Sequence, residues 1–99
     1  MFLKVIISYL RVILFMEVDN MISFGNRLRA LREDLDLSSA QLANELNIST
    51  RALNYYENDA REPSFPLLIK IADYFNVSTD YLLGRTNVKI PHKKNKAQD

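Results

Sequence analysis

The stretch that decides the fold runs from Leu37 to Asn58 and reads "LSSAQLANELNISTRALNYYEN". Ser38 is followed three residues later by Gln41, which is the capping-box pattern of a helix start. Ser49 is the kind of residue that begins a second helix. Asn47 lies between the two patterns, where a sharp turn needs a positive φ that asparagine accepts more readily than most residues. The stretch therefore predicts two short helices joined by a tight turn.

Apolar residues indicate how these two helices pack. Leu42, Ala43 and Leu46 share the inner face of the first helix. A side chain as small as that of Ala43 lets a second helix approach closely. Two helices joined in this way form a helix-turn-helix, and the second helix of that motif can enter the major groove of DNA.

Helix signals continue on both sides of this pair. Ser23 precedes "FGNRLRALREDL", Ser64 precedes "FPLLIKIADYF", and Ser78 precedes "TDYLLG". Pro66 is tolerated because it falls in a first turn, and Gly84 ends the last helix. The pattern predicts five short helices, and no segment alternates well enough to be a strand. The expected fold class is all-α.

Composition divides the chain into three parts: an apolar extension (1–20), a helical domain (22–86) and a basic tail (87–99). The domain carries seven basic and nine acidic groups, whereas the tail has four lysines against one aspartate. A domain with net charge −2 binds a polyanion only if its basic groups gather on one face. The tail has few bulky apolar residues, and we expect it to be disordered.

Residues 24–86 resemble the phage-repressor-like (Xre / Cro-type) helix-turn-helix transcriptional regulators. The matching segments are "LRALRED", "LSSAQLANELNIST", "YYENDAREPS", "LIKIADYFNVS" and "DYLLGRT". The resemblance implies a five-helix, lambda-repressor-like DNA-binding domain. It also implies a cytoplasmic repressor that binds a palindromic double-stranded DNA operator as a homodimer, with the third helix in the major groove.

The same resemblance implies which residues contact DNA. Thr50, Arg51 and Tyr55 fall on base-facing positions, with Asn54 beside them, and Arg51 suits a guanine, with a phosphate as the alternative. Asn58 and Arg61, just past the third helix, fall where phosphate contacts are common, and Ser39 and Ser49 are the remaining DNA-binding candidates. Ser39 stands where members of the family commonly have a glutamine that contacts a phosphate. Asp59 replaces a usual glycine, and its charge is expected to weaken binding slightly.

Three arginines of the first helix of the domain are interpreted differently. Arg32 and Glu57 occupy positions that resemble a structural ion pair, which ties that helix to the end of the third. Arg27 and Arg29 lie away from the apolar stripe. We expect both to be solvated charges, with phosphate contact as the alternative.

The inventory of reactive groups argues against an enzyme and against a bound metal or cofactor. The chain has no cysteine, two glycines and one histidine, His92, which stands alone in the tail. This leaves no thiolate, no Cys-based zinc site, no glycine-rich phosphate loop and no histidine placed to activate a serine.

The extension "MFLKVIISYLRVILFMEVDN" is not explained by the resemblance. Lys4, Ser8 and Arg11 would share one stripe of a helix, but the β-branched residues favour a strand, so both remain open. Residues 2–16 as a helix would reach about 22 Å, too short for a membrane span. The extension is a candidate surface for a second copy or another protein through residues 1–16. Packing on its own domain, membrane contact and a natural start at Met16 or Met21 are the alternatives. An antitoxin-type protein-binding module and a membrane-associated regulator remain alternative functions.

Overall fold

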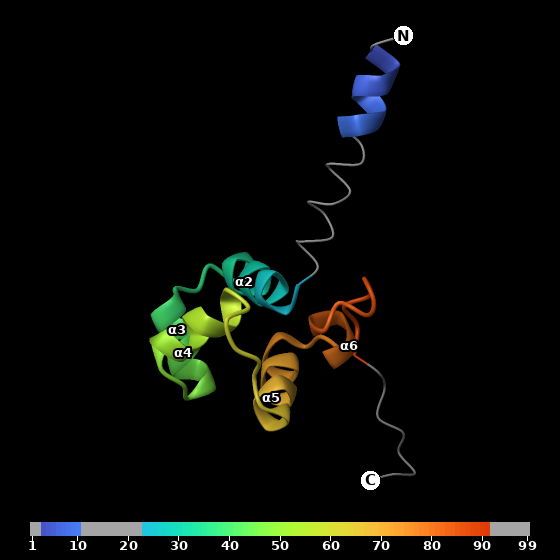
Figure 1. The fold of residues 1–99 in the computed structure, drawn as a ribbon. Helices are drawn as coiled ribbons and strands as arrows, with labels where there is room; N and C mark the ends of the chain where they lie inside the picture. Colours follow the sequence, from blue (N-terminus) through green and yellow to red (C-terminus); the bar gives the residue numbers. More distant parts are fainter. Residues whose placement is uncertain (1–2, 11–22, 92–99) are drawn as a thin grey trace, which may run out of the picture.

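The computed structural model describes residues 3–10 and 23–91, and every regular element within these ranges is an α-helix (Figure 1). The all-α expectation is confirmed, and the five helices of the domain occur in the predicted order. They are α2 (Phe24–Asp34), α3 (Ser39–Leu46), α4 (Thr50–Glu57), α5 (Phe65–Phe75) and α6 (Thr79–Leu82).

Each of these helices begins at a serine whose side chain accepts a hydrogen bond from the backbone N–H three residues further on. The capping serines are Ser23, Ser38, Ser49, Ser64 and Ser78. At α3 the capping box is complete, because the backbone N–H of Ser38 also donates to Gln41 Oε1 at 2.8 Å. Such caps satisfy N–H groups that have no partner inside a helix.

Two asparagines end α3 and α5 in the left-handed conformation. Asn47 has φ 58° and Asn76 has φ 54°. After each, a backbone N–H returns to a carbonyl of the last turn, from Ile48 to Ala43 at 2.9 Å and from Val77 to Ala72 at 3.0 Å. These turns aim the following helix back across the one before it.

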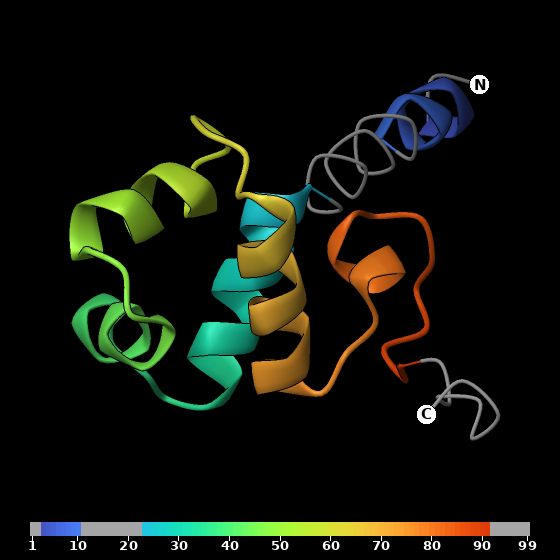
Figure 2. The same ribbon diagram turned by 90° about the horizontal axis from the view of Figure 1, so that it is seen from below.

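The core lies where the helices converge. α2 and α5 form the middle of the domain, with α3 and α4 on one side and α6 on the other (Figures 1 and 2). α4 packs on both α2 and α3. The fully buried large side chains are Leu28, Leu42, Leu46, Leu53, Ile71 and Leu82. α4 contributes only Leu53 to that set, so most of its surface remains available.

A buried ion pair holds the end of α4 against α2. Arg32 donates from Nε to Glu57 Oε2 at 2.7 Å and from its second terminal nitrogen to Oε1 at 3.1 Å. The Glu57 side chain is 3 % exposed. Arg29 also lies near it, with Nε 3.5 Å from Oε1. The hydrogen bonds that Arg32 donates to Glu57 raise the pKa of Arg32, against the opposing effect of burial, so the guanidinium stays charged.

Arg27 differs from the expectation of a solvated charge, which was wrong for this residue. It is 7 % exposed, and its guanidinium lies 4.2 Å from the centre of the Tyr81 ring. It donates to the carbonyls of Tyr81 and Thr86 and, at 2.7 Å, to Asn87 Oδ1. Because the side chain crosses the core edge to α6 and the chain beyond it, Arg27 is a structural residue.

The start of the tail also packs on the domain. The backbone N–H of Ser78 donates to the carbonyl of Lys89 at 2.9 Å, and Asn87 accepts the bond from Arg27. Residues 87 and 89, which we expected to belong to a disordered tail, therefore make defined contacts with the domain. The lysines at 93, 94 and 96 and His92 lie outside the described residues.

Residues 3–10 are helical, and every residue in that range is exposed. This answers the choice between helix and strand for these eight positions. Of the helices in the described part of the chain, none combines the length and the apolarity needed to cross a bilayer. The rest of the proposed 1–16 surface falls outside the described residues.

Gly25 marks the closest approach of α2 to the end of α4. A Cβ atom added there would lie 2.4 Å from the Glu57 carbonyl oxygen and 2.7 Å from that of Tyr56. The backbone N–H of Gly25 donates to Asp59 Oδ1 at 2.8 Å. Asp59 adopts φ 57°, so this residue fills a turn position that favours glycine and also caps α2.

We expect Gly25→Ala to destabilise the domain by about 1–3 kcal/mol, because the methyl group meets backbone atoms that cannot rotate away. Urea unfolding followed by circular dichroism measures this change. Asp34→Ala, on the exposed end of the same helix, should stay within about 0.5 kcal/mol of the parent chain. Equal effects of the two substitutions would show that the close approach is absent.

We expect Glu57→Gln to cost about 3–5 kcal/mol, because it removes the charge that compensates the largely buried guanidinium of Arg32. The same unfolding measurement applies. The control is Glu45→Gln, which makes the same chemical change at an exposed position of α3. A Glu57→Gln chain as stable as the control would contradict the structural role of the ion pair.

Candidate nucleic-acid interface

The outer face of α4 carries the polar residues expected to contact DNA. Thr50, Arg51 and Asn54 are exposed, and Tyr55 is half-buried beside them. The opposite face holds Leu53 in the core. The turn at Asn47 and the cap at Ser49 fix where the helix begins, so the outer face is presented by a short, firmly anchored element.

Tyr55 joins two arginines that are ten residues apart in the sequence. Arg51 Nε donates to the Tyr55 hydroxyl at 3.0 Å, and its guanidinium carbon lies 5.7 Å from the ring centre. The guanidinium carbon of Arg61 lies closer to that centre, at 4.5 Å. Ser49 and Ala52 complete a hollow of about 300 Å³ around these three side chains. We call Arg51, Tyr55 and Arg61 the Tyr55 cluster.

The Tyr55 cluster is a local concentration of positive charge in a domain that is acidic overall. Among the described residues, neither Arg51 nor Arg61 forms an ion pair. Two guanidinium groups that contact one ring repel each other, and an anion bound between them would offset this repulsion. The arrangement is therefore suited to an anionic ligand that spans both arginines.

Asn58 lies beside this face but is occupied by the protein itself. Its side-chain nitrogen donates to the Asn54 carbonyl at 2.8 Å, and its Oδ1 accepts from Arg29 at 2.9 Å. Arg29 also reaches the carbonyl of Glu57 at 3.4 Å. The role of Arg29 at the end of α4 was missed, although its spacing of three from Arg32 places both on one helix face.

The two serines proposed as DNA contacts lie at helix starts. Ser39 is the first residue of α3 and is partly exposed. Ser49 is exposed, and its hydroxyl accepts from the backbone N–H of Ala52 at 3.0 Å.

The carbonyl at the end of α3 is also satisfied, since Lys70 Nζ donates to Leu46 O at 2.8 Å. Lys70 is therefore occupied by a structural contact.

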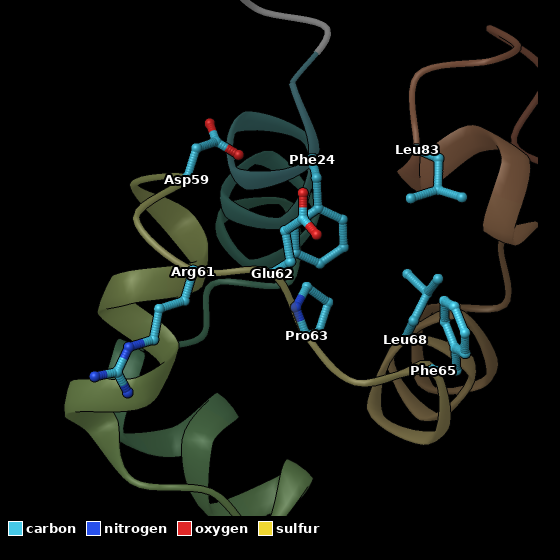
Figure 3. Close-up of a pocket in the computed structure, with 8 residues that line it drawn as sticks. All are labelled: Phe24, Asp59, Arg61, Glu62, Pro63, Phe65, Leu68 and Leu83. Carbon is cyan, nitrogen blue, oxygen red and sulfur yellow. The ribbon is translucent and has the colours of Figure 1, made fainter.

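A second hollow opens next to the Tyr55 cluster and is mainly apolar (Figure 3). We call it the groove. Phe24 and Pro63 lie on one side of it and Leu68, Phe65 and Leu83 on the other, while the guanidinium of Arg61 points away (Figure 3). Its volume is about 370 Å³, and Asp59 and Glu62 add negative charge to its lining. Phe65 is 83 % exposed and Leu83 51 %.

The described residues contain no group of three or more acidic, histidine or cysteine side chains that could hold a metal ion. They likewise leave no buried side-chain nitrogen or oxygen without a hydrogen-bond partner.

Comparison with known proteins gives this geometry a context. The Helix-turn-helix family model matches residues 28–82. The chain is 41% identical over 73 residues to the HTH-type transcriptional regulator ImmR of Bacillus subtilis (strain 168). This alignment covers 74% of this chain and 55% of ImmR. It is 37% identical over 59 residues to the cryptic phage CTXphi transcriptional repressor RstR of Vibrio cholerae, covering 60% of this chain and 53% of that one.

A solved structure is similar as well. The P22 c2 repressor protein, in a crystal structure with synthetic operator 9T, aligns with a TM-score of 0.61 at 30% identity, over 65% of this chain and 97% of that chain. The chain spans little more than half the length of ImmR and RstR. The match includes α3, the turn at Asn47 and α4. This chain belongs to the helix-turn-helix family.

Proposed function

We propose that this protein is a sequence-specific, double-stranded DNA-binding transcriptional regulator that acts in the cytoplasm and represses by occupying a palindromic operator. The observation that carries the proposal is the outer face of α4, where Arg51 and Asn54 are exposed and the half-buried Tyr55 lies beside Arg61. The names of ImmR and RstR, and the operator bound to the P22 c2 repressor, support it.

In this proposal α4 enters the major groove and its residues divide into two kinds. Arg51 reads a base, because a guanidinium can donate two hydrogen bonds to guanine O6 and N7. Thr50 and Asn54 lie beside it. Ser39, Ser49, Asn58 and Arg61 lie near the phosphates, which set the position of the helix without reading sequence. The side chain of Asn58 has less hydrogen-bonding capacity left for DNA than the others, because it already makes two hydrogen bonds within the protein.

Arg51→Ala should weaken binding to the preferred DNA by roughly 5- to 150-fold, which corresponds to about 1–3 kcal/mol for a lost bidentate base contact. Binding to unrelated DNA should change much less. The site is first searched for in the DNA upstream of the protein's own gene, against shuffled DNA of equal length. Fluorescence anisotropy at two salt concentrations measures the affinity for the preferred DNA and for the unrelated DNA.

Lys93→Ala is the control for this experiment, because it also removes one positive charge, but from the basic tail. We expect it to have little effect. If both substitutions weakened binding to every sequence equally, Arg51 would be a phosphate contact. If the parent chain showed no preference for any DNA, the proposed function would be wrong.

The proposal includes a homodimer, because two copies can place their α4 helices in successive major grooves about 34 Å apart. The groove offers a self-complementary surface. It presents an apolar hollow and, at its edge, the exposed ring of Phe65, so two copies related by a two-fold axis could each insert Phe65 into the other.

We expect Phe65→Glu to shift the protein to monomer, since it would place a charge in an apolar contact. Ile69→Glu is the matched control: Ile69 is also an exposed apolar residue of α5, but it does not line the groove. Sedimentation velocity over a range of concentrations measures the change. A parent chain that stays monomeric, both free and on a two-fold symmetric DNA, would overturn the homodimer.

A second candidate function rests on the helical segment 3–10. Its exposed large apolar side chains are Leu3, Val5, Ile6, Ile7, Tyr9 and Leu10. Contiguous apolar surface of this kind is typical of protein contacts. An antitoxin-type module, with DNA binding as autoregulation, would use it for a protein partner. The same segment is also the alternative surface for joining two copies of this chain. In that case Ile6→Glu would disrupt the dimer and Phe65→Glu would not.

A further inference from the structure

We propose that Tyr55 acts as a positioning residue: its hydroxyl orients Arg51 for a base, and its ring holds Arg61 for a backbone phosphate. The inference rests on the proposed function and assigns Tyr55 a different role from that of a base contact. It follows from the contacts of the Tyr55 cluster, which bind both arginines to one side chain.

The first contact determines how Arg51 is presented. The bond to the Tyr55 hydroxyl uses Nε, at 3.0 Å, and leaves the two terminal nitrogens of the guanidinium for a ligand. Those two nitrogens can form the paired bonds that guanine accepts. A free arginine on an exposed helix samples many rotamers and loses that freedom on binding. A hydroxyl that already holds Nε reduces this loss and favours one orientation.

The second contact concerns Arg61, which comes from the loop after α4. Its guanidinium lies 4.5 Å from the Tyr55 ring centre, and no hydrogen bond or ion pair holds it among the described residues. Stacking on the ring leaves the donors at the edge of the guanidinium free. The same loop carries Asp59, which accepts a hydrogen bond from α2. This bond holds the backbone of the loop, so Arg61 starts from a fixed position beside the hollow of about 300 Å³. Such a group suits a phosphodiester.

Tyr55 itself is poorly placed to read a base. Its hydroxyl already accepts a bond from Arg51, and one ring face is covered by Arg61. The side chain is also half-buried, whereas Arg51 and Arg61 are exposed. The two guanidinium groups are therefore more accessible to a ligand than the phenol is.

The test separates the hydroxyl from the ring. A preferred DNA is selected from a randomised 20-bp library with the parent chain, and anisotropy is then measured on it and on its single-base variants. Tyr55→Phe keeps the ring but removes the hydroxyl. We expect it to reduce discrimination about three- to tenfold, as for a lost hydrogen bond, at the base pair that Arg51→Ala affects. The salt dependence should not change.

Tyr55→Leu removes both contacts, so it should also lower the slope of log K against log salt by about 0.9, the value for one phosphate. Tyr56→Phe is the matched control, because it removes a hydroxyl from the next residue and should leave discrimination unchanged. In an Arg51→Ala background, Tyr55→Phe should cost no further discrimination. That result distinguishes positioning of Arg51 from a general structural effect, which would persist in the double variant.

Three outcomes would overturn the inference while leaving the proposed function intact. In the first, Tyr55→Phe discriminates as well as the parent chain. In the second, it weakens binding equally on all sequences, which would show that the hydroxyl contacts DNA directly. In the third, it costs the same with and without Arg51. A parent chain that selects no preferred DNA would instead overturn the proposed function, and this inference with it.

Discussion

The carboxylate of Glu57 is the group on which the placement of α4 depends. It lies in the interior at the last residue of that helix and is neutralised by Arg32, with Arg29 close by. A buried carboxylate without a partner is costly, so the protein maintains α2 and α4 in the one arrangement where guanidinium and carboxylate meet. Gly25 allows the backbones to come close enough for this. The outer face of α4 therefore has a defined direction relative to the whole domain.

The candidate interface combines anchored and adjustable parts. The helix is held by its cap at Ser49, by the turn at Asn47 and by the ion pair at its end. The adjustable part consists of long polar side chains. Two of these, Arg51 on the outer face of α4 and Arg61 in the loop after it, contact Tyr55. A site built this way loses less conformational entropy on binding than one built on mobile side chains.

Local signals explain why the helices could be predicted from sequence. Serine caps, the asparagine turns and the apolar spacing each act over a few residues, and all five helices follow from them. The turn at Asn47 is of this kind. The burial of Arg27 does not follow from a local signal, because its acceptors at Thr86 and Asn87 are distant in the chain and no local pattern predicts them. The Tyr55–Arg61 contact likewise depends on the course of the loop, and the Asp59 bond to Gly25 depends on how α2 and α4 pack.

The anchoring of Arg27 has a consequence for what counts as the folding unit. The family match ends at residue 82, where α6 ends. Two of the acceptors of Arg27 lie after that point, and the carbonyl of Lys89 receives the N–H of Ser78. A fragment that ended at residue 82 would keep all five helices of the domain, yet the Arg27 guanidinium would lose its acceptors at Thr86 and Asn87. The packed unit is thus longer than the span of the family model, and it closes with an irregular segment of chain after α6.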